Sequence, residues 1–211
     1  SSEESLYRPE AVRWRERMQL MKPIGDTVVL LPCSMKKPYS NSKSHMKFRK
    51  VTRSFQELII TSPFGICPRE LEETFPIQSY DVAVTGNWSQ DEIDESGKIL
   101  KEYVKGKTVV AHVSGGYEEV CRQYLDDCIY TCVDGKPTSP DSIYNLRMEL
   151  KNHPKISRRE KVLNKLKSIA VYQWGEKASE FIPEDVKTKG QFHKKILSGN
   201  KQLAMLNMHQ G

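Results

Sequence analysis

Five apolar runs with β-forming residues recur along this chain of 211 residues, and the segments between several of them have helical character. The runs are TVVLLP, ELIITS, YDVAVTG, KTVVAHVSG and CIYTCVDG, and the helical segments are HMKFRKVTRSFQ, SQDEIDESGKILKEYVKG and YEEVCRQYLDD. Continuous apolar runs are typical of strands that are buried on both faces. Strands that alternate with helices favour right-handed crossovers and a mainly parallel sheet. We therefore predict an α/β fold, a three-layer sandwich with a mainly parallel sheet, followed by a small α+β C-terminal segment.

Changes in composition along the chain predict four parts. The segment YRPEAVRWRERMQLMKP has a proline in its first turn and ends before another, which indicates an N-terminal helix within residues 1–24. Residues 25–152 form the predicted α/β core catalytic domain. Residues 153–175 form a predicted basic linker helix, whose charged face could contact phosphate or simply be solvated. Residues 176–211 would begin a small α+β domain.

The overall composition favours a globular protein with a phosphate-bearing partner. Hydrophobic residues make up 37% of the chain, which is enough for a core, and the net charge of +6 favours binding to polyanions. The longest apolar runs are far shorter than a membrane span, and the first residues do not resemble a signal peptide. We predict a cytoplasmic protein with no membrane partner.

The five cysteines argue against a disulfide framework because their number is odd and the protein is predicted to be cytoplasmic. Cys121, Cys128 and Cys132 have the spacing C-x6-C-x3-C, which matches no common structural zinc site. We interpret Cys128 and Cys132 as small residues beside a short strand. We predict no metal and no cofactor.

The segments that follow the predicted strands are the informative part of the sequence. They read PCSMKKPYS, TSPFGICPRE, TGNWSQDE, SGGYEE and DGKPTSPDS. The carboxyl ends of parallel strands meet at one edge of a sheet, where open α/β sheets bind their ligands. Turn chemistry accounts for TGNW and DGKP. It does not account for the longer loop PCSMKKPYSNSKSH, which we predict to be the rim of an active site.

Three side chains of this loop could do chemistry. Cys33 is followed by Lys36 and Lys37, and nearby cations would stabilise a nucleophilic thiolate. His45, at the expected start of the next helix, could donate or accept a proton. Tyr39 could stack on a base or bind through its hydroxyl. The alternatives are a buried cysteine without chemistry, a polar surface histidine and a packing tyrosine.

The loop also fits a pattern, P-C-x3-K-P-Y-x2-S-x2-H, that resembles the signature of archaeosine synthase, an archaeal tRNA-modifying relative of tRNA-guanine transglycosylase. The residues that satisfy it are Pro32, Cys33, Lys37, Pro38, Tyr39, Ser42 and His45. The resemblance continues in TSPFGICPRELEETFP and in YDVAVTGNW, and it covers roughly residues 25–150. Full-length members of that family have a transglycosylase-like barrel before this core and an RNA-binding PUA module after it, neither of which we expect in this chain.

The resemblance implies a defined reaction. The family acts on tRNA that carries 7-cyano-7-deazaguanine, and it attaches the side-chain amine of free lysine to the nitrile carbon on the way to archaeosine. The implied partners are tRNA and free lysine as co-substrate, and a further modification enzyme could complete the pathway. In our hypothesis Cys33 adds to the nitrile to form a thioimidate, His45 is the acid or base, and Lys37 holds the thiolate or contacts phosphate. In the alternative, lysine attacks directly and Cys33 only lines the pocket.

We expect the substrate-binding residues to lie in the same strand-end segments. They are Ser34, Tyr39, Ser42, Ser62, Phe64, Gly65, Arg69, Glu70, Ser114, Gly115 and Gly116. Phe64 could stack on a flat base, while Arg69 and Glu70 could bind the charged ends of the amino acid. The amides after Ser114 would favour an anion at a helix N-terminus. Helix capping and tight turns are the alternative roles of all these residues.

Two other functions remain open from the sequence. One is a non-catalytic tRNA-binding or scaffold domain, against which the complete loop motif argues. The other is a glycosylase that releases a deazaguanine-related base, which would need a carboxylate beside the sugar. Asp81 and Asp91 flank one predicted strand end, but neither belongs to a recognisable motif.

Overall fold

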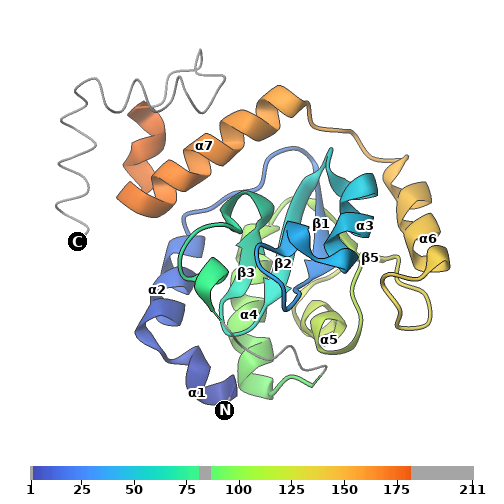
Figure 1. The fold of residues 1–211 in the computed structure, drawn as a ribbon, viewed down its shortest axis with the longest axis horizontal. Coiled ribbons are helices and arrows are strands. Elements are labelled where there is room, and N and C mark those ends of the chain that lie inside the picture. The colour runs from blue at the N-terminus through green and yellow to red at the C-terminus, as the bar shows by residue number, and fades with distance from the viewer. Residues whose placement is uncertain (1, 81–86, 182–211) are drawn as a thin grey trace. The chain divides into compact units, whose positions relative to one another are not determined.

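The computed structural model describes residues 2–80 and 87–181 (Figure 1). The chain divides into two compact units, residues 1–155 and residues 156–211. The first unit contains all the strands of the sheet and the helices that connect them. The predicted run YDVAVTG falls, apart from Tyr80, outside the described residues, as does most of the predicted small α+β segment.

The first unit is built on a five-stranded sheet of order β3-β2-β1-β4-β5. Its strands are β1 (Thr27–Pro32), β2 (Gln56–Thr61), β3 (Gly65–Pro68), β4 (Thr108–Ala111) and β5 (Ile129–Tyr130). The central strand β1 pairs in parallel with β2 and β4, and β4 pairs in parallel with β5. The prediction of an α/β fold with a mainly parallel sheet is therefore confirmed.

Strand β3 is the exception to the parallel arrangement. It pairs antiparallel with β2, with Thr61 opposite Gly65 and Leu58 opposite Pro68. Our interpretation of TSPFGICPRE as one strand-end loop was therefore wrong, because only its first residues form the turn. Gly65 has a positive φ of 87°, which lets the chain reverse direction there. The chain then runs back along β2, so Arg69 lies near the opposite end of that strand.

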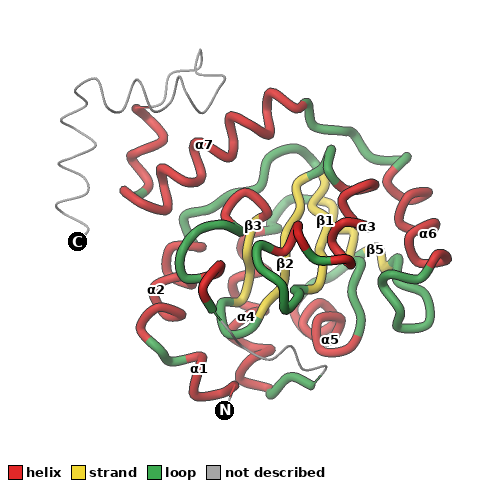
Figure 2. Tube along the Cα trace, in the orientation of Figure 1, coloured by secondary structure: helices red, strands yellow, loops and turns green. Residues whose placement is uncertain are grey.

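Helices cover both faces of the sheet, with the strands between them (Figure 2). The helices are α1 (Ser2–Leu6), α2 (Pro9–Met18), α3 (Lys43–Thr52), α4 (Gln90–Tyr103), α5 (Gly115–Tyr124) and α6 (Pro140–Leu150). Short 3-10 turns are η1 (Tyr39–Asn41), η2 (Arg69–Leu71) and η3 (Ile77–Ser79). On one face α3 and α6 pack side by side, and on the other α4 and α5 do so. These three layers form the core.

The α3–α6 face is packed with large apolar side chains. Val29 and Leu31 of β1 contact Phe48 of α3 and Leu146 of α6, all of them fully buried. Burial of side chains of this size contributes roughly 1.5–3 kcal/mol each. Because β1 is apolar on both faces, it is fixed at the centre of the sheet and its carboxyl end is fixed with it.

Helix α2 covers the free edge of β3. The indole nitrogen of Trp14 donates to the carbonyl of Ile66 at 2.8 Å, and the Arg15 guanidinium donates to the carbonyl of Pro63 at 2.6 Å. Both carbonyls belong to the β2–β3 hairpin, so α2 satisfies backbone groups that a bare sheet edge would expose.

The second unit begins with helix α7 (Arg158–Trp174) and the 3-10 helix η4 (Glu176–Phe181). The hydroxyl of Ser157 accepts the backbone N–H of Glu160 at 3.2 Å and so caps α7. Among the described residues, no helix combines the length and the apolar composition that crossing a bilayer requires.

The packing of α4 against α5 depends on Gly97. A Cβ atom at this position would lie 2.1 Å from Cδ2 of Tyr124, far inside contact distance. We predict that Gly97→Ala lowers the free energy of unfolding by about 1–3 kcal/mol, measured by urea denaturation. In a Tyr124→Ala background the same change should cost clearly less, because the clash is removed. An equal cost in both backgrounds would contradict this explanation.

Candidate active site

The loop that follows β1 lies at the point where the strand order of the sheet reverses. From β1 the chain passes through α3 to β2 on one side, whereas β4 and β5 lie on the other side of β1. The carboxyl ends of β1 and β4 therefore lead into different connections, and this switch point is where open α/β sheets usually place their ligand crevice. We refer to this region as the crevice. Cys33 follows β1, and residues 112–117 lead from β4 into α5.

This crevice brings together a thiol and a phenol. The Sγ atom of Cys33 lies 2.9 Å from the hydroxyl oxygen of Tyr117, in the first turn of α5. Burial raises the pKa of the Cys33 thiol, and hydrogen bonds from Tyr117 and Thr61 and the charge of Lys37 only partly offset this. Burial also raises the pKa of Tyr117 well above its usual range. Both groups are therefore protonated at neutral pH.

Trp88 forms one side of this crevice. Its ring packs edge to face with that of Tyr117, with the ring centroids 5.1 Å apart, and its side chain is half-buried. A Cβ atom on Gly116 would lie 2.0 Å from Cδ1 of the indole, so only glycine allows Trp88 to lie against the start of α5. Gly116 therefore has a packing role, whatever its amide binds. Of its two predicted companions, Gly115 is exposed, while Ser114 is the N-cap residue but makes no side-chain capping bond.

Lys37 shapes the loop and lies near Cys33. Its ammonium donates to the carbonyl of Ser34 at 2.8 Å and lies 4.8 Å from the centroid of the Tyr39 ring. The hydroxyl of Ser34 donates to the carbonyl of Lys36 at 3.1 Å. Lys37 lowers the pKa of Cys33 as predicted, but burial has the larger effect and leaves the thiol neutral.

The geometry around His45 contradicts the acid–base role predicted for it. The ring is fully buried, with Nε2 2.7 Å from the carbonyl oxygen of Pro32 and Nδ1 2.9 Å from the Arg69 guanidinium. The carbonyl can only accept and the guanidinium can only donate, so the proton is on Nε2. Burial, then the charge of Arg69, lowers the pKa of His45 to about 3. His45 is thus a neutral residue that ties α3 to the end of β1.

Arg69 also has a structural role in place of the predicted substrate contact. Its guanidinium makes five hydrogen bonds, two to Glu57 and one each to Ser40, Glu72 and His45. Those bonds use all five of its N–H groups, so none is left for a ligand. We call these five residues, Arg69, Glu57, Glu72, Ser40 and His45, the Arg69 network. Glu70, its predicted partner in binding, accepts instead from the side-chain amide of Gln56 at 3.0 Å.

Four more predicted binding residues are packed into the protein. The ring of Tyr39 is buried and its hydroxyl donates to Thr61 at 3.4 Å, while Ser42 caps α3 by accepting the N–H of His45 at 3.2 Å. Phe64 is buried between Trp14 and Tyr80, so its ring cannot stack on a base. Gly65 begins β3. Burial, helix capping or strand pairing thus accounts for each of these four residues.

The hydroxyl oxygen of Ser62 is buried and has no hydrogen-bond partner within the described part of the chain. Asp91 is exposed in the first turn of α4, and Asp81 lies outside the described residues. Across residues 2–80 and 87–181, no three His, Cys, Asp or Glu side chains cluster in a way that could bind a metal.

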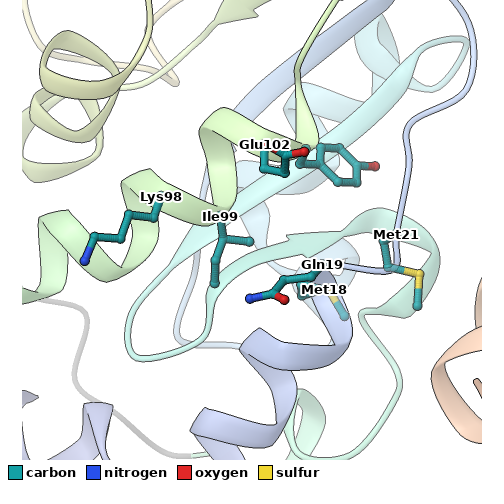
Figure 3. A pocket seen from close by; sticks show the side chains of 7 residues that line it. Met18, Gln19, Met21, Lys98, Ile99 and Glu102 are labelled. Carbon is teal, nitrogen blue, oxygen red and sulfur yellow. The ribbon is translucent and has the colours of Figure 1, made fainter.

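A separate hollow of about 400 Å³ lies between α2 and α4 and contains none of the predicted site residues. Its lining residues are Met18, Gln19, Met21, Lys98, Ile99, Glu102 and Tyr103. In Figure 3, Ile99 points towards Gln19 while Lys98 extends away from it. The hollow is thus lined by apolar side chains with charged groups at its margin.

Sequence reasoning missed Tyr117 and Trp88. Each lies within a segment that we quoted, Tyr117 in SGGYEE and Trp88 in TGNWSQDE. A functional interpretation of every aromatic residue within two positions of a strand-end glycine would have found both.

The Arg69 network should be essential for stability. We predict that Arg69→Met lowers the free energy of unfolding by about 3–5 kcal/mol in urea, because it leaves the buried carboxylate of Glu57 without its counter-charge. Arg122 is the matched control, since its ion pair with Glu118 is exposed. Arg122→Met should change stability by less than about 1 kcal/mol. Similar losses in both variants would contradict the role of burial.

His45 should make stability depend on pH. Because its pKa is about 3 in the folded protein and about 6.5 when unfolded, the unfolded state binds more protons below pH 6.5. The stability of the fold that depends on a neutral His45 is fully present above pH 6.5 and is lost as the pH falls towards 3. Between pH 7.5 and 5.0 the wild type should lose about 2 kcal/mol more than His45→Asn in urea unfolding. Equal losses would show that His45 is not held neutral.

Comparison with known proteins agrees with this fold and loop. The family model described as "Domain of unknown function (DUF5591)" matches residues 11–150. The chain is 39% identical to archaeosine synthase subunit alpha of Methanosarcina acetivorans and 35% identical to archaeosine synthase of Methanocaldococcus jannaschii, in each case over 96% of its own length. It spans only 36% and 37% of those two relatives.

Similarity also extends to a solved structure. The crystal structure of AF0587, a protein of unknown function, is 32% identical with a TM-score of 0.61, and the match covers 77% of this chain and 57% of that one. The resemblance predicted from the Cys33 loop is thus confirmed by similarity over most of the chain. The chain belongs to the DUF5591 family and is similar to archaeosine synthases.

Proposed function

We propose that this chain acts in the archaeosine modification of tRNA, as the part that carries out chemistry on the nitrile of 7-cyano-7-deazaguanine. Two relatives named archaeosine synthase or its subunit alpha support the first half of this proposal. The site at the switch point of the sheet supports the second half. The nitrile carbon would receive the side-chain amine of free lysine.

The observation that carries the proposal is the 2.9 Å contact between Cys33 and Tyr117. A nitrile is a weak electrophile, so attack on its carbon requires a proton for its nitrogen at the same time. A thiol that is hydrogen-bonded to a phenol supplies a nucleophile and a proton donor side by side. Both groups are neutral in the resting protein, so no charge has to be stabilised in the crevice before the substrate arrives.

The first step adds Cys33 across the nitrile. A bond forms between Sγ and the nitrile carbon, and one π bond of the triple bond breaks. Tyr117 donates its hydroxyl proton to the nitrile nitrogen and receives the thiol proton of Cys33 in exchange. The product is a neutral thioimidate, and no external acid is consumed. Tyr117 thus takes the role that we had predicted for His45.

The second step transfers the carbon to lysine. The neutral amine forms a bond with the thioimidate carbon, the bond between carbon and Sγ breaks, and a proton of the amine returns to the thiol. The product is an amidine-linked lysine. Trp88, half-buried beside Tyr117, offers the aromatic surface on which the base would stack, in place of Phe64.

Intact-mass analysis of the protein with the free cyano-deazaguanine base tests the nucleophile. We expect a wild-type adduct of the mass of one base, no adduct on Cys33→Ser, and about 10²- to 10⁴-fold slower adduct formation by Tyr117→Phe, which loses the proton donor. Cys121→Ser is the matched control, because that thiol is fully buried in α5 and should leave the adduct unchanged.

Transfer of labelled lysine to tRNA that contains the nitrile base then separates the alternatives. Unchanged transfer by Cys33→Ser would reject covalent catalysis and favour direct attack. Release of the base would indicate a glycosylase, and no reaction of any kind would indicate a scaffold domain.

A further inference from the structure

We infer that the outward face of helix α3 binds the phosphate backbone of the RNA next to the base that enters the crevice. We define this basic face by Lys43, Lys47 and Lys50. The inference rests on the proposed function for the identity of the RNA, and it adds the surface that would hold it.

Positive charge is concentrated in one part of the chain. Residues 27–55 contain seven of the 33 lysines and arginines and none of the 27 aspartates and glutamates. The remaining residues carry 26 basic and 27 acidic side chains and are almost neutral as a set. The net charge of +6 therefore comes from the Cys33 loop and α3, not from the chain as a whole.

Helix α3 directs this charge into solvent. His45, Phe48 and Thr52 face the core, at positions i, i+3 and i+7. Lys43, Lys47 and Lys50, at positions i, i+4 and i+7, share the opposite side of the helix, and all three are exposed. Within the described part of the chain, none of the three lysines is paired with a carboxylate. A polyanion is the partner whose charge complements such a face.

The basic face begins where the Cys33 loop ends. Ser42 is the N-cap of α3, so the basic face starts with Lys43 directly after the non-helical part of the loop that carries Cys33. Lys36 and Met35, also exposed, extend the surface along the loop itself. From Lys43 to Lys50 the helix rises by about 10 Å, which is roughly the axial length of three stacked nucleotides.

The structure favours RNA over a membrane as the occupant. An interfacial helix inserts its apolar face into the lipid, but that face of α3 is buried against β1 and α6. Among the helix's exposed side chains only Met46 is a large apolar one; it is 57% exposed and is followed by Lys47. The basic face can therefore bind a partner through charge alone, which suits the phosphate backbone of a nucleic acid.

A pair of charge-reversal variants tests the inference. One is K43E/K47E/K50E on α3, and the matched control is K98E/K101E/K105E, three exposed lysines of α4 and the turn after it. Binding to tRNA is measured by fluorescence anisotropy over a range of salt concentrations. We expect the α3 variant to lose at least tenfold in affinity, and the slope of log K against log salt to fall by about 2. The control should keep the wild-type slope.

Three results would overturn the inference. They are an unchanged slope in the α3 variant, an equal loss in the α4 control, and loss of binding to phosphatidylserine vesicles by the α3 variant while tRNA binding persists. The free-base adduct at Cys33 is measured in the same samples. Its retention in the α3 variant shows an intact crevice, and its absence in the wild type would reject the proposed chemistry without affecting the RNA result.

Discussion

The ion pairs of Arg69 with Glu57 and Glu72 are the interaction on which the site geometry depends. Charges buried this deeply are stable only when they are paired and fully hydrogen-bonded, and here a single guanidinium satisfies that condition. Through Ser40 and His45 the same group fixes the Cys33 loop and the start of α3. A loop rich in serine and lysine therefore has one defined path, and Cys33 a defined place beside Tyr117.

Charge and reactivity occupy different layers of this region. The Arg69 network lies beneath the loop, the neutral pair of Cys33 and Tyr117 lies in the crevice, and the lysines of α3 lie outside. In the proposed function each layer has its own task. The Arg69 network positions the loop, the pair of Cys33 and Tyr117 reacts with the nitrile, and the lysines of α3 attract the RNA. The charge of Lys37 favours the thiolate of Cys33, but burial has the larger effect on its pKa.

The sequence predicts the sheet better than the site, because strands follow from local composition whereas the site depends on contacts between residues far apart in the chain. Strands β1, β2 and β4 overlap apolar runs, because burial on both faces imposes such a composition locally. The two residues of β5 also lie in an apolar run, although they are only partly buried. Strand β3 has only four residues and contains a proline, so its pairing follows from the hairpin turn and not from its own residues.

The site depends on long-range contacts that no local pattern records. Tyr117 is 84 residues from Cys33, and only the order of the strands brings the two together. The loop motif contains Cys33, which stays a predicted nucleophile, and it also contains Tyr39, Ser42 and His45, which serve the architecture of the loop. A motif thus identifies residues that matter without distinguishing those that react from those that position them.

The protonated state of Cys33 also has a consequence for the lifetime of the protein. Oxidants such as peroxide attack thiolates, and repeated oxidation carries a cysteine to sulfinic and sulfonic acids that most cells cannot reverse. A thiol whose pKa is raised by burial is a poor target for that chemistry. In the proposed function, the burial that keeps Cys33 a thiol until the substrate arrives therefore also protects it from oxidative inactivation.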